Sequence, residues 1–298
     1  MKNVKWIILL ASIMILISLN SCEEEKVEPP EKQAASSFYD HMQEWYLWYD
    51  KMPDIEPSNY STPEEVLKAI KYEKDKWSYI TTVEKFEQYY KEASFTGYGF
   101  SYGTDTAGNV RITFTLEESP MRDYGIKRSW IIKSVDGENI NSAEELNELL
   151  GSTDAGQTNE FTIISPSGSD TVEQTFTSTE MTRNTVLHSS IINTESGKTG
   201  YMVLNNFVEK TSAELLSVFQ SFSQENIEHM VIDLRYNGGG MLSRANELGD
   251  YLIEDNHIKD VFAKIMHNEK KEDQNNYHYF KQDSLSLNWS LSEIYFIT

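Results

Sequence analysis

The sequence predicts an α+β protein of several domains: a small helical N-terminal domain, a β-rich domain and an α/β segment. Between residues 38 and 93, apolar side chains recur every three or four positions, which is the period of a helix. From 94 to 182, short alternating runs are bounded by glycine, asparagine and aspartate, which predicts strands and turns. From 185 to 298, buried strands alternate with amphipathic helices, as in an α/β fold.

The composition limits the classes of function. The 298 residues suggest roughly two domains of ordinary size, and a hydrophobic content of 39% is enough for packed cores. The formal net charge is −21. A protein that binds nucleic acid needs a basic stripe, so we expect no nucleic-acid partner.

The first 22 residues have the form of a secretory signal. Two lysines precede an apolar run from Trp6 to Leu19, which is too short for a normal membrane span. Cys22 follows in "LNSC", which resembles a bacterial lipobox, where the thiol is lipidated. We therefore expect a lipoprotein signal peptide over 1–22 and membrane attachment through a lipid anchor at Cys22. The Glu-, Lys- and Pro-rich residues 23–37 are predicted to form a flexible tether.

The acidic run after the cysteine, "EEEK", resembles the export signal of surface-displayed Bacteroidetes lipoproteins. We expect an outer-membrane lipoprotein of the cell envelope, on the periplasmic or the cell-surface face. Because Cys22 is the only cysteine, an internal disulfide is excluded.

The helical domain is predicted over 38–93. In "FYDHMQEWYLWYDKM" we expect one buried helix face that includes Phe38, Met42 and Trp45. Prolines end this helix, and a serine or threonine before Pro63 is expected to cap the next one. "TTVEKFEQYYKEA" predicts a third short helix. The aromatic stripes are interpreted as core, and the domain shows no catalytic motif.

The β-rich domain is predicted over 94–182. It contains one helix, "AEELNELLG", which Ser142 caps, with Glu145 completing a capping box and Gly151 ending the helix. The stretch "GYGF" at 97–100 is consistent with an ordinary glycine hairpin when taken alone. Together with "SVDG" and the capped helix at matching spacing, it resembles the carboxylate-binding loop of a PDZ domain.

This resemblance implies a peptide-binding site. In PDZ domains, the loop amides hold the terminal carboxylate of a peptide, which adds as a strand between the second strand and the helix. Gly97, Tyr98, Gly99 and Phe100 are therefore expected to bind peptide. Glycine suits such a loop because it lets the backbone N–H groups turn toward an anion.

The α/β segment contains a glycine-rich turn. "HMVIDLR" is a nearly continuous apolar strand, as expected when both faces are covered, and three glycines at 238–240 follow it. A dinucleotide site would need a third spaced glycine where Ser243 stands, and a phosphate-binding P-loop would need Gly-Lys-Ser/Thr. The remaining interpretation is an oxyanion hole, whose donors face the negative oxygen that develops during attack on an acyl carbon.

The string "VIDLRYNGGGMLSRANELGDYLI" resembles the Asp-Leu-Arg-x-Asn-x-Gly-Gly segment of the carboxyl-terminal processing, or tail-specific, serine peptidases. These enzymes carry a PDZ domain directly upstream. The resemblance covers roughly residues 38–298 and implies that 185–298 is the N-terminal part of a protease domain of ClpP/crotonase-like fold. It also implies that the amides of Gly239 and Gly240 supply one side of the oxyanion hole. Asp233, Arg235 and Asn237 would support this loop. The alternative for Asp233 and Arg235 is an ion pair at the end of the strand that has no role in the mechanism.

The family's catalytic pair is expected to lie beyond Thr298. Its enzymes use a Ser–Lys dyad, and the serine sits in a small-residue run that directly follows a short apolar strand. "LSEIYFIT" resembles that strand, and it ends at Thr298. We therefore expect the nucleophile and base to be absent from these residues and the 298-residue chain to be inactive alone. The six histidines lack metal-ligand spacing, so no metal is expected. The Ser–Lys mechanism that the resemblance implies needs neither metal nor nucleotide, so no cofactor is expected.

Taken together, these features predict a secreted serine peptidase that captures the C-terminal tails of proteins or peptides on its PDZ domain and hydrolyses peptide bonds through the Ser–Lys dyad. The alternative is a non-catalytic PDZ-type peptide-binding surface lipoprotein. A structural surface lipoprotein without a ligand is a third possibility.

Overall fold

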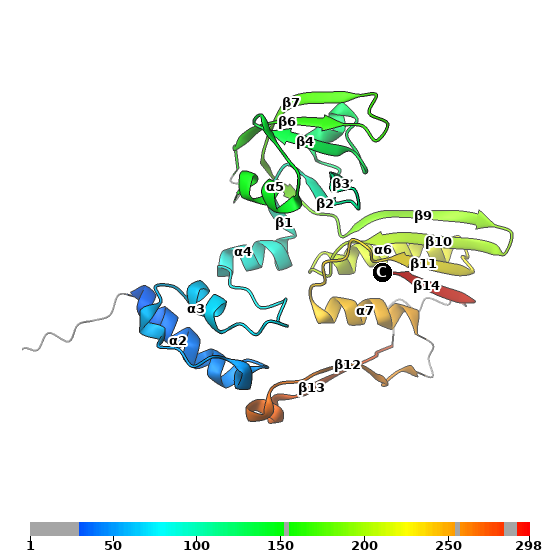
Figure 1. Cartoon of the computed structure of the whole chain (residues 1–298). Helices are drawn as coiled ribbons and strands as arrows, with labels where there is room; N and C mark the ends of the chain where they lie inside the picture. The colour runs from blue at the N-terminus through cyan, green and yellow to red at the C-terminus, as the bar shows by residue number, and fades with distance from the viewer. Residues whose placement is uncertain (1–29, 152–154, 254–256, 283–290) are drawn as a thin grey trace, which may run out of the picture. The chain divides into compact units, whose positions relative to one another are not determined.

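The computed structural model describes residues 30–151, 155–253, 257–282 and 291–298. Cys22, the signal peptide and residues 23–29 of the expected tether lie outside this range. Within the described part of the chain, no helix is both long enough and apolar enough to cross a membrane. Helices, a β-rich sheet and an α/β sheet follow one another along the chain (Figure 1), which confirms the predicted α+β architecture.

The chain divides into two compact units whose limits differ from the expected domains. The first unit ends at Ile80 rather than at 93, and it also contains residues 266–275 from the distant C-terminal part. The second unit contains 81–265 and 276–298, so the β-rich and α/β segments belong together. The third predicted helix therefore packs with these segments.

Helix α2 (Pro30–Trp45) corrects the expected tether, which was drawn to residue 37. Proline is favoured in the first turn of a helix, and the following "EKQAA" has high helix propensity. Ala35 is fully buried in the core of the first unit. Residues 30–37 therefore form a structural part of the helix.

The predicted buried face is confirmed for Met42, which lies in the core, and for Phe38, which packs against it, but not for Trp45. Tyr39, Met42 and Tyr46, at spacings of three and four, lie in the core, while Trp45 remains 38% exposed. The hydroxyl of Tyr46 donates to Oδ2 of the buried Asp75 at 2.8 Å. This long-range polar contact favours the tyrosine face over the equally periodic stripe through Trp45.

The remaining elements of the first unit complete its small core. Val66, Leu67 and Ile70 of α3 (Pro63–Ile70) pack against the buried face of α2. Asn268 donates to the carbonyl oxygens of Glu44 and Tyr46 at 2.9 and 3.0 Å, so it satisfies two acceptors at the end of α2. The other short helices are η1 (Tyr49–Lys51), η2 (Pro57–Asn59) and η6 (Glu269–Gln274).

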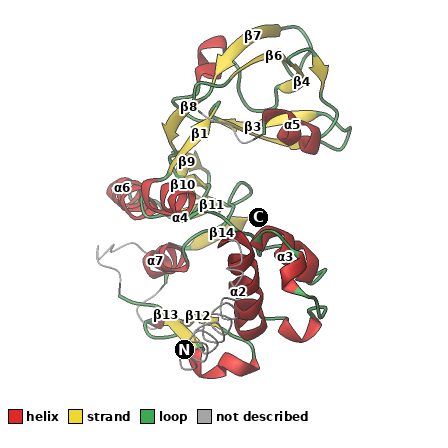
Figure 2. Cartoon of the chain, turned by 90° about the vertical axis from the view of Figure 1, so that its left-hand side faces the viewer, coloured by secondary structure: helices red, strands yellow, loops and turns green. Residues whose placement is uncertain are grey.

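The second unit begins with α4 (Val83–Glu87) and a π-helical turn, η3 (Gln88–Glu92). Strand β1 (Ser94–Gly97) then pairs antiparallel with β8 (Thr179–Thr182), and the two strands lie side by side in Figure 2. This pairing joins the first and the last strand of the β-rich segment.

Between β1 and β8 lies a sheet in the order β2-β3-β4-β6-β7 with one α-helix, which we call the β-module. Met121, Ile132, Leu146 and Phe161 are fully or almost fully buried in its core. Ser142 caps α5 as predicted, with its hydroxyl accepting from Glu145 N at 3.1 Å. The elements are β2 (Phe100–Thr104), β3 (Val110–Thr115), η4 (Pro120–Tyr124), β4 (Ile131–Val135), β5 (Glu138–Asn139), α5 (Ala143–Leu150), β6 (Thr158–Ile164) and β7 (Thr171–Thr177).

The α/β segment forms a four-stranded sheet in the order β14-β11-β10-β9 (Figure 1). Strand β11 is parallel to both β10 and β14, while β9 is antiparallel to β10. Two helices pack on one face of the sheet, where Met202 and Ile232 meet Phe219 and Tyr251. The elements are β9 (Val186–Thr194), β10 (Gly197–Leu204), α6 (Thr211–Gln224), β11 (His229–Asp233), α7 (Leu242–Leu252), β12 (Val261–Ile265), β13 (Asn276–Tyr279) and β14 (Glu293–Ile297).

The opposite face of this sheet differs from the sequence expectation for β11. Tyr201 and Val231 on that face are only half-buried, and Tyr295 is 52% exposed. The apolar run of β11 therefore does not mean that both faces are covered: one face is well packed, and the other is partly open to solvent.

Candidate active site and peptide groove

The glycine loop connects the end of β11 to the start of α7. The backbone N–H of Gly238 donates to Asn205 O at 2.9 Å, and Phe207 N–H donates to Gly239 O at 2.9 Å. Met241 N–H in turn donates to Phe207 O at 2.6 Å. The segment from Asn205 to Phe207, directly after β10, therefore holds the loop along its length.

Asp233 and Arg235 form an ion pair at the start of this loop. Arg235 Nε and Nη2 donate to the Asp233 carboxylate at 2.9 and 2.6 Å, and the Tyr201 hydroxyl donates to it at 2.8 Å. Asp233 is almost fully buried, whereas Arg235 is half-exposed. The hydrogen bonds from Arg235 outweigh the effect of burial and lower the pKa of Asp233 to about 2. The pair therefore stabilises the strand end itself.

The two predicted oxyanion donors have different surroundings. The N–H of Gly239 donates to Asn237 Oδ1 at 2.8 Å, and Asn237 Nδ2 donates to Leu204 O at 3.2 Å. The N–H of Gly240 has no partner in the described part of the chain, and Gly240 is exposed. Gly240 is thus the donor that the loop leaves available, while the amide of Gly239 is used to shape the turn.

The "GYGF" stretch forms the link from β1 to β2. The Tyr98 side chain lies in the core of the β-module, where its hydroxyl contacts Asn159 and its ring lies 5.1 Å from that of Phe161. Burial raises the pKa of Tyr98. Gly99 has a φ of 73° and accepts a hydrogen bond from Leu116 N–H at 2.8 Å. The side chain of Tyr98 is thus mainly structural, and only backbone groups of the loop suit anion binding.

One cavity of about 550 Å³ extends from the "GYGF" stretch to Gly238, the first glycine of the glycine loop. Its lining on the β-module includes Gly97, Tyr98 and Phe100, together with α5 residues, and its other side includes Gly238. Gly239, Gly240 and Gly99 are outside this lining. The lining residues that sequence reasoning missed are Tyr89, Phe95, Tyr102, Phe114, Leu116, Asn147, Leu150, Arg183, Asn205, Asn206 and Tyr236, with Thr96, Ser101 and Gly151.

Among the described residues that line this cavity, Arg183 is the one that carries a formal charge. Its guanidinium lies 5.3 Å from the Tyr89 ring centre and 5.0 Å from that of Phe95. Its Nη1 donates to Asn206 Oδ1 at 3.1 Å. A fixed cation between two aromatic faces makes the cavity suitable for an anionic group.

Three contacts join the elements around the cavity. The Tyr102 hydroxyl of β2 contacts Asn147 of α5, so the two sides of the groove meet through polar side chains. The Tyr236 ring of the glycine loop lies 5.8 Å from the Phe114 ring of β3, and the Arg128 guanidinium lies 5.3 Å from the Tyr236 ring centre. The glycine loop therefore packs directly against the β-module.

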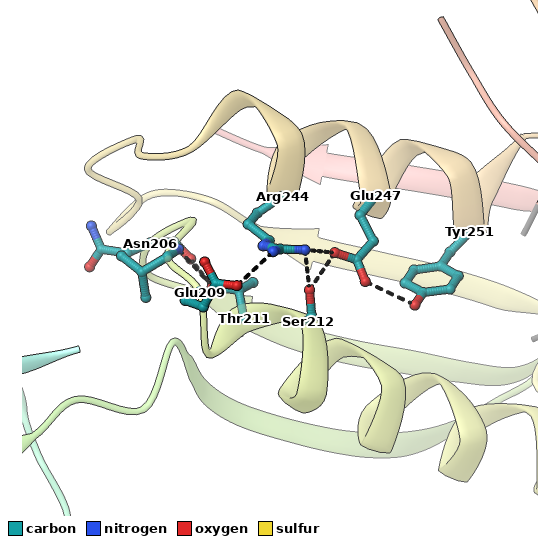
Figure 3. Close-up of polar contacts among 8 residues, drawn as sticks. Asn206, Glu209, Thr211, Ser212, Arg244, Glu247 and Tyr251 are labelled. Atoms are coloured by element: carbon teal, nitrogen blue, oxygen red, sulfur yellow. Dashed lines mark hydrogen bonds and ion pairs between the residues drawn. The ribbon is translucent and has the colours of Figure 1, made fainter. Parts of the chain in front are cut away.

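A polar cluster holds the helices that flank the glycine loop. Arg244, in the first turn of α7, donates to Ser212 Oγ at 2.7 Å, to Glu247 at 2.9 Å and to Glu209 at 3.0 Å. Figure 3 shows Arg244 reaching from α7 to the start of α6. These bonds fix the first turns of both helices relative to each other. In the described ranges, no group of three or more His, Cys, Asp or Glu residues could hold a metal ion.

Comparison with known proteins identifies two matching segments. Residues 35–79 match the peptidase S41 N-terminal domain, and residues 198–289 match peptidase family S41. The CtpA-like serine protease of Staphylococcus aureus strain COL is 25% identical over 187 residues, which cover 62% of this chain. The chain matches only 36% of the length of that relative, and a Staphylococcus epidermidis counterpart gives similar values, with 24% identity.

Two solved structures share the fold. An S41 protease from Bacteroides fragilis NCTC 9343 superposes with a TM-score of 0.58 at 22% identity, covering 87% of this chain and 70% of that one. The photosystem II D1 C-terminal processing protease gives a TM-score of 0.52 at 17% identity, covering 90% and 75%.

Proposed function

Because the chain carries segments of peptidase family S41, we propose that it belongs to a serine peptidase of the carboxyl-terminal processing type. In this proposal the β-module is a PDZ domain that captures the C-terminal tail of a protein substrate. The bound chain then passes to the glycine loop, where a peptide bond is hydrolysed. The single observation that carries the proposal is the cavity that has both "GYGF" residues and Gly238 in its lining.

The chemistry of each part follows from its geometry. An extended tail adds along β2, where main-chain hydrogen bonds provide affinity for many sequences. The "GYGF" backbone receives the terminal carboxylate, and Arg183 adds positive charge to the same cavity. Two residues beyond Gly238, the N–H of Gly240, which has no partner in the described part of the chain, supports the oxyanion that forms on the attacked carbonyl.

We propose that the nucleophile and the base lie outside these 298 residues. The sequence contains no small-residue serine run of the family type. Strand β14 is parallel to β11, and Ile297 pairs with Asp233. A residue that follows β14 would therefore reach the sheet edge from which the glycine loop starts, which is where a nucleophile is needed.

Tail capture is tested by fluorescence anisotropy with a labelled ten-residue peptide that ends in Ala-Val-Leu, prepared with a free carboxylate and as the C-terminal amide. We expect the free acid to bind at least about tenfold more tightly, because hydrogen bonds to a charged group contribute about 1.5–3 kcal/mol. Equal affinity of the two forms would contradict carboxylate capture. No binding of either form would contradict a PDZ function for the β-module.

Catalysis is tested separately with the purified 298-residue chain and a quenched fluorescent peptide. We expect no turnover above that of a mock purification. Cleavage that survives rigorous purification would show that the catalytic groups lie within this chain. If the gene extends past codon 298 and encodes the serine run and a lysine, the longer product should cleave; a natural stop there would favour the non-catalytic binder.

We also propose that the protein is an outer-membrane lipoprotein anchored through Cys22. The "LNSC" motif after a short apolar run supports this placement. Metabolic labelling with an alkyne fatty acid, followed by membrane fractionation, should label wild type and leave Cys22→Ser unlabelled. Label that persists in Cys22→Ser would contradict the anchor.

A further inference from the structure

Asn205 lies directly after β10, between the glycine loop and the cavity, and it is only 6% exposed. Its backbone N–H donates to Thr185 O at 2.7 Å, and its carbonyl oxygen accepts from Gly238 N–H. Its side-chain Nδ2 donates to Tyr236 O at 2.8 Å. These three bonds fix both the backbone and the orientation of the carboxamide.

The Oδ1 atom of Asn205 is buried and has no hydrogen-bond partner in the described part of the chain. A buried polar atom without a partner costs about 1–3 kcal/mol, so such an atom favours binding of a hydrogen-bond donor from a ligand or from water. The next residue, Asn206, provides a contrast. Its Nδ2 donates to the Tyr89 hydroxyl at 2.8 Å and its Oδ1 accepts from Arg183, so both of its polar groups are paired.

The residues around the cavity limit which kind of donor could form a hydrogen bond with Asn205 Oδ1. The cavity lining includes the cation Arg183 and no acidic side chain among the described residues. An ammonium or guanidinium donor is therefore disfavoured by like-charge repulsion. A neutral N–H or O–H donor remains, and in a cavity that holds a peptide the extended main chain presents an N–H at every residue except proline.

We propose that the Asn205 carboxamide oxygen accepts a main-chain N–H of the bound peptide. Asn205 thereby becomes a substrate-binding residue that positions the chain between the tail groove and the glycine loop. This inference rests on the proposed function, because it requires that a peptide occupies the cavity. It goes beyond tail capture because it assigns a register: one backbone amide of the substrate is fixed opposite Asn205.

The test uses the labelled peptide with a free carboxylate and a series in which each backbone amide in turn is replaced by an ester, which removes one N–H. Binding of the whole series is measured for wild type and for Asn205→Leu. At one position, wild type should lose about fivefold in affinity, and Asn205→Leu should show no loss there. Positions that pair with β2 should lose affinity in both proteins.

Two further variants make the result specific. Asn205→Asp keeps an acceptor oxygen and should retain the loss at the same position. Asn206→Leu is the matched control: it can lower overall affinity through Arg183, but the position-specific loss should persist. Asn205→Ala replaces the leucine variant if circular dichroism shows that the latter is unfolded.

The outcomes separate the inference from the function on which it rests. If wild type binds the peptide and Asn205→Leu shows the same ester profile as wild type, the assignment is overturned and Oδ1 is paired by a water molecule. If wild type binds no peptide at all, tail capture fails and the assignment fails with it. Loss of the position-specific effect in Asn206→Leu as well would also overturn the assignment to Asn205.

Discussion

Gly99 and Gly240 both have positive φ angles, 73° and 136°, yet the space around them differs in kind. A Cβ on Gly99 would meet Met181 Sδ and Ser119 Cβ at 2.7 Å, so the loop is pressed against side chains of β8 and of the residue before η4. A Cβ on Gly240 would lie 2.1 Å from the backbone oxygen of Phe207. The first loop is shaped by side-chain packing, and the second by the close approach of two backbone segments.

This difference shows that glycine serves two purposes in this chain. Gly108 and Gly239 also have positive φ angles, but a Cβ at either position would meet nothing within 4 Å. These two glycines are needed for backbone conformation alone, whereas Gly99 and Gly240 are needed for conformation and for space. Each crowded glycine therefore has an uncrowded partner that serves as its control.

The largest effect is expected at Gly240. Gly240→Ala should lower the free energy of unfolding of the second unit by roughly 3 kcal/mol or more, because a backbone oxygen cannot yield as a flexible side chain can. Gly239→Ala should cost only about 1–2 kcal/mol, the usual cost of a left-handed residue with a Cβ. Urea unfolding measures both. Equal losses would show that the contact with Phe207 does not constrain the loop.

The second-largest effect on stability is expected at Gly99. We expect Gly99→Ala to cost about 2 kcal/mol, less than Gly240→Ala, because the Met181 side chain can move while Ser119 cannot. It should also weaken binding of the free-acid peptide by about tenfold, since the carboxylate-binding backbone shifts. Gly108→Ala, in the turn between β2 and β3, should leave peptide affinity unchanged. An equal loss of peptide affinity in Gly99→Ala and Gly108→Ala would show that Gly99 has no specific role in carboxylate binding.

Substitution of Asp233 tests whether its ion pair with Arg235 stabilises the start of the glycine loop. Its pKa is lowered from 3.8 to about 2, so its contribution to stability is fully present above pH 4 and is lost as the pH falls toward 2. We expect Asp233→Asn to cost about 2 kcal/mol at pH 7 and progressively less between pH 4 and pH 2. Urea unfolding across this pH range measures the difference. A difference that stays constant with pH would contradict the assignment.

The smallest effect concerns the side chains that hold each loop. Asn237 Oδ1 accepts from Gly239 N–H in one loop, and the Ser119 hydroxyl donates to Tyr98 O at 2.8 Å in the other. Asn237→Ala and Ser119→Ala should each cost about 1 kcal/mol. Only Ser119→Ala should also lower peptide affinity, because it supports the carboxylate loop. Hydrogen exchange of the Gly239 amide should accelerate in Asn237→Ala alone; no acceleration would place that amide in another interaction.

Several parts of the fold follow from local sequence. The capped helix after Ser142 and the strand before the glycine loop are readable because a cap residue and a continuous apolar run each indicate one structure. The start of α2 and its buried face are not. Tyr39 and Tyr46 compete with Trp45 at nearly the same period, and the hydrogen bond that favours Tyr46 comes from Asp75, about thirty residues away.

Some features of the candidate site can likewise be predicted from local sequence, and others cannot. Two backbone loops with glycine, at 97–100 and 238–240, are visible in the sequence as segments that can present N–H groups, because positive φ and the absence of a Cβ are properties of single residues. That residues of both loops line one cavity is a property of the tertiary structure. The charge that Arg183 supplies to this cavity and the unpaired oxygen of Asn205 are also set by the tertiary structure. These features depend on contacts between residues far apart in the chain, which local periodicity does not encode.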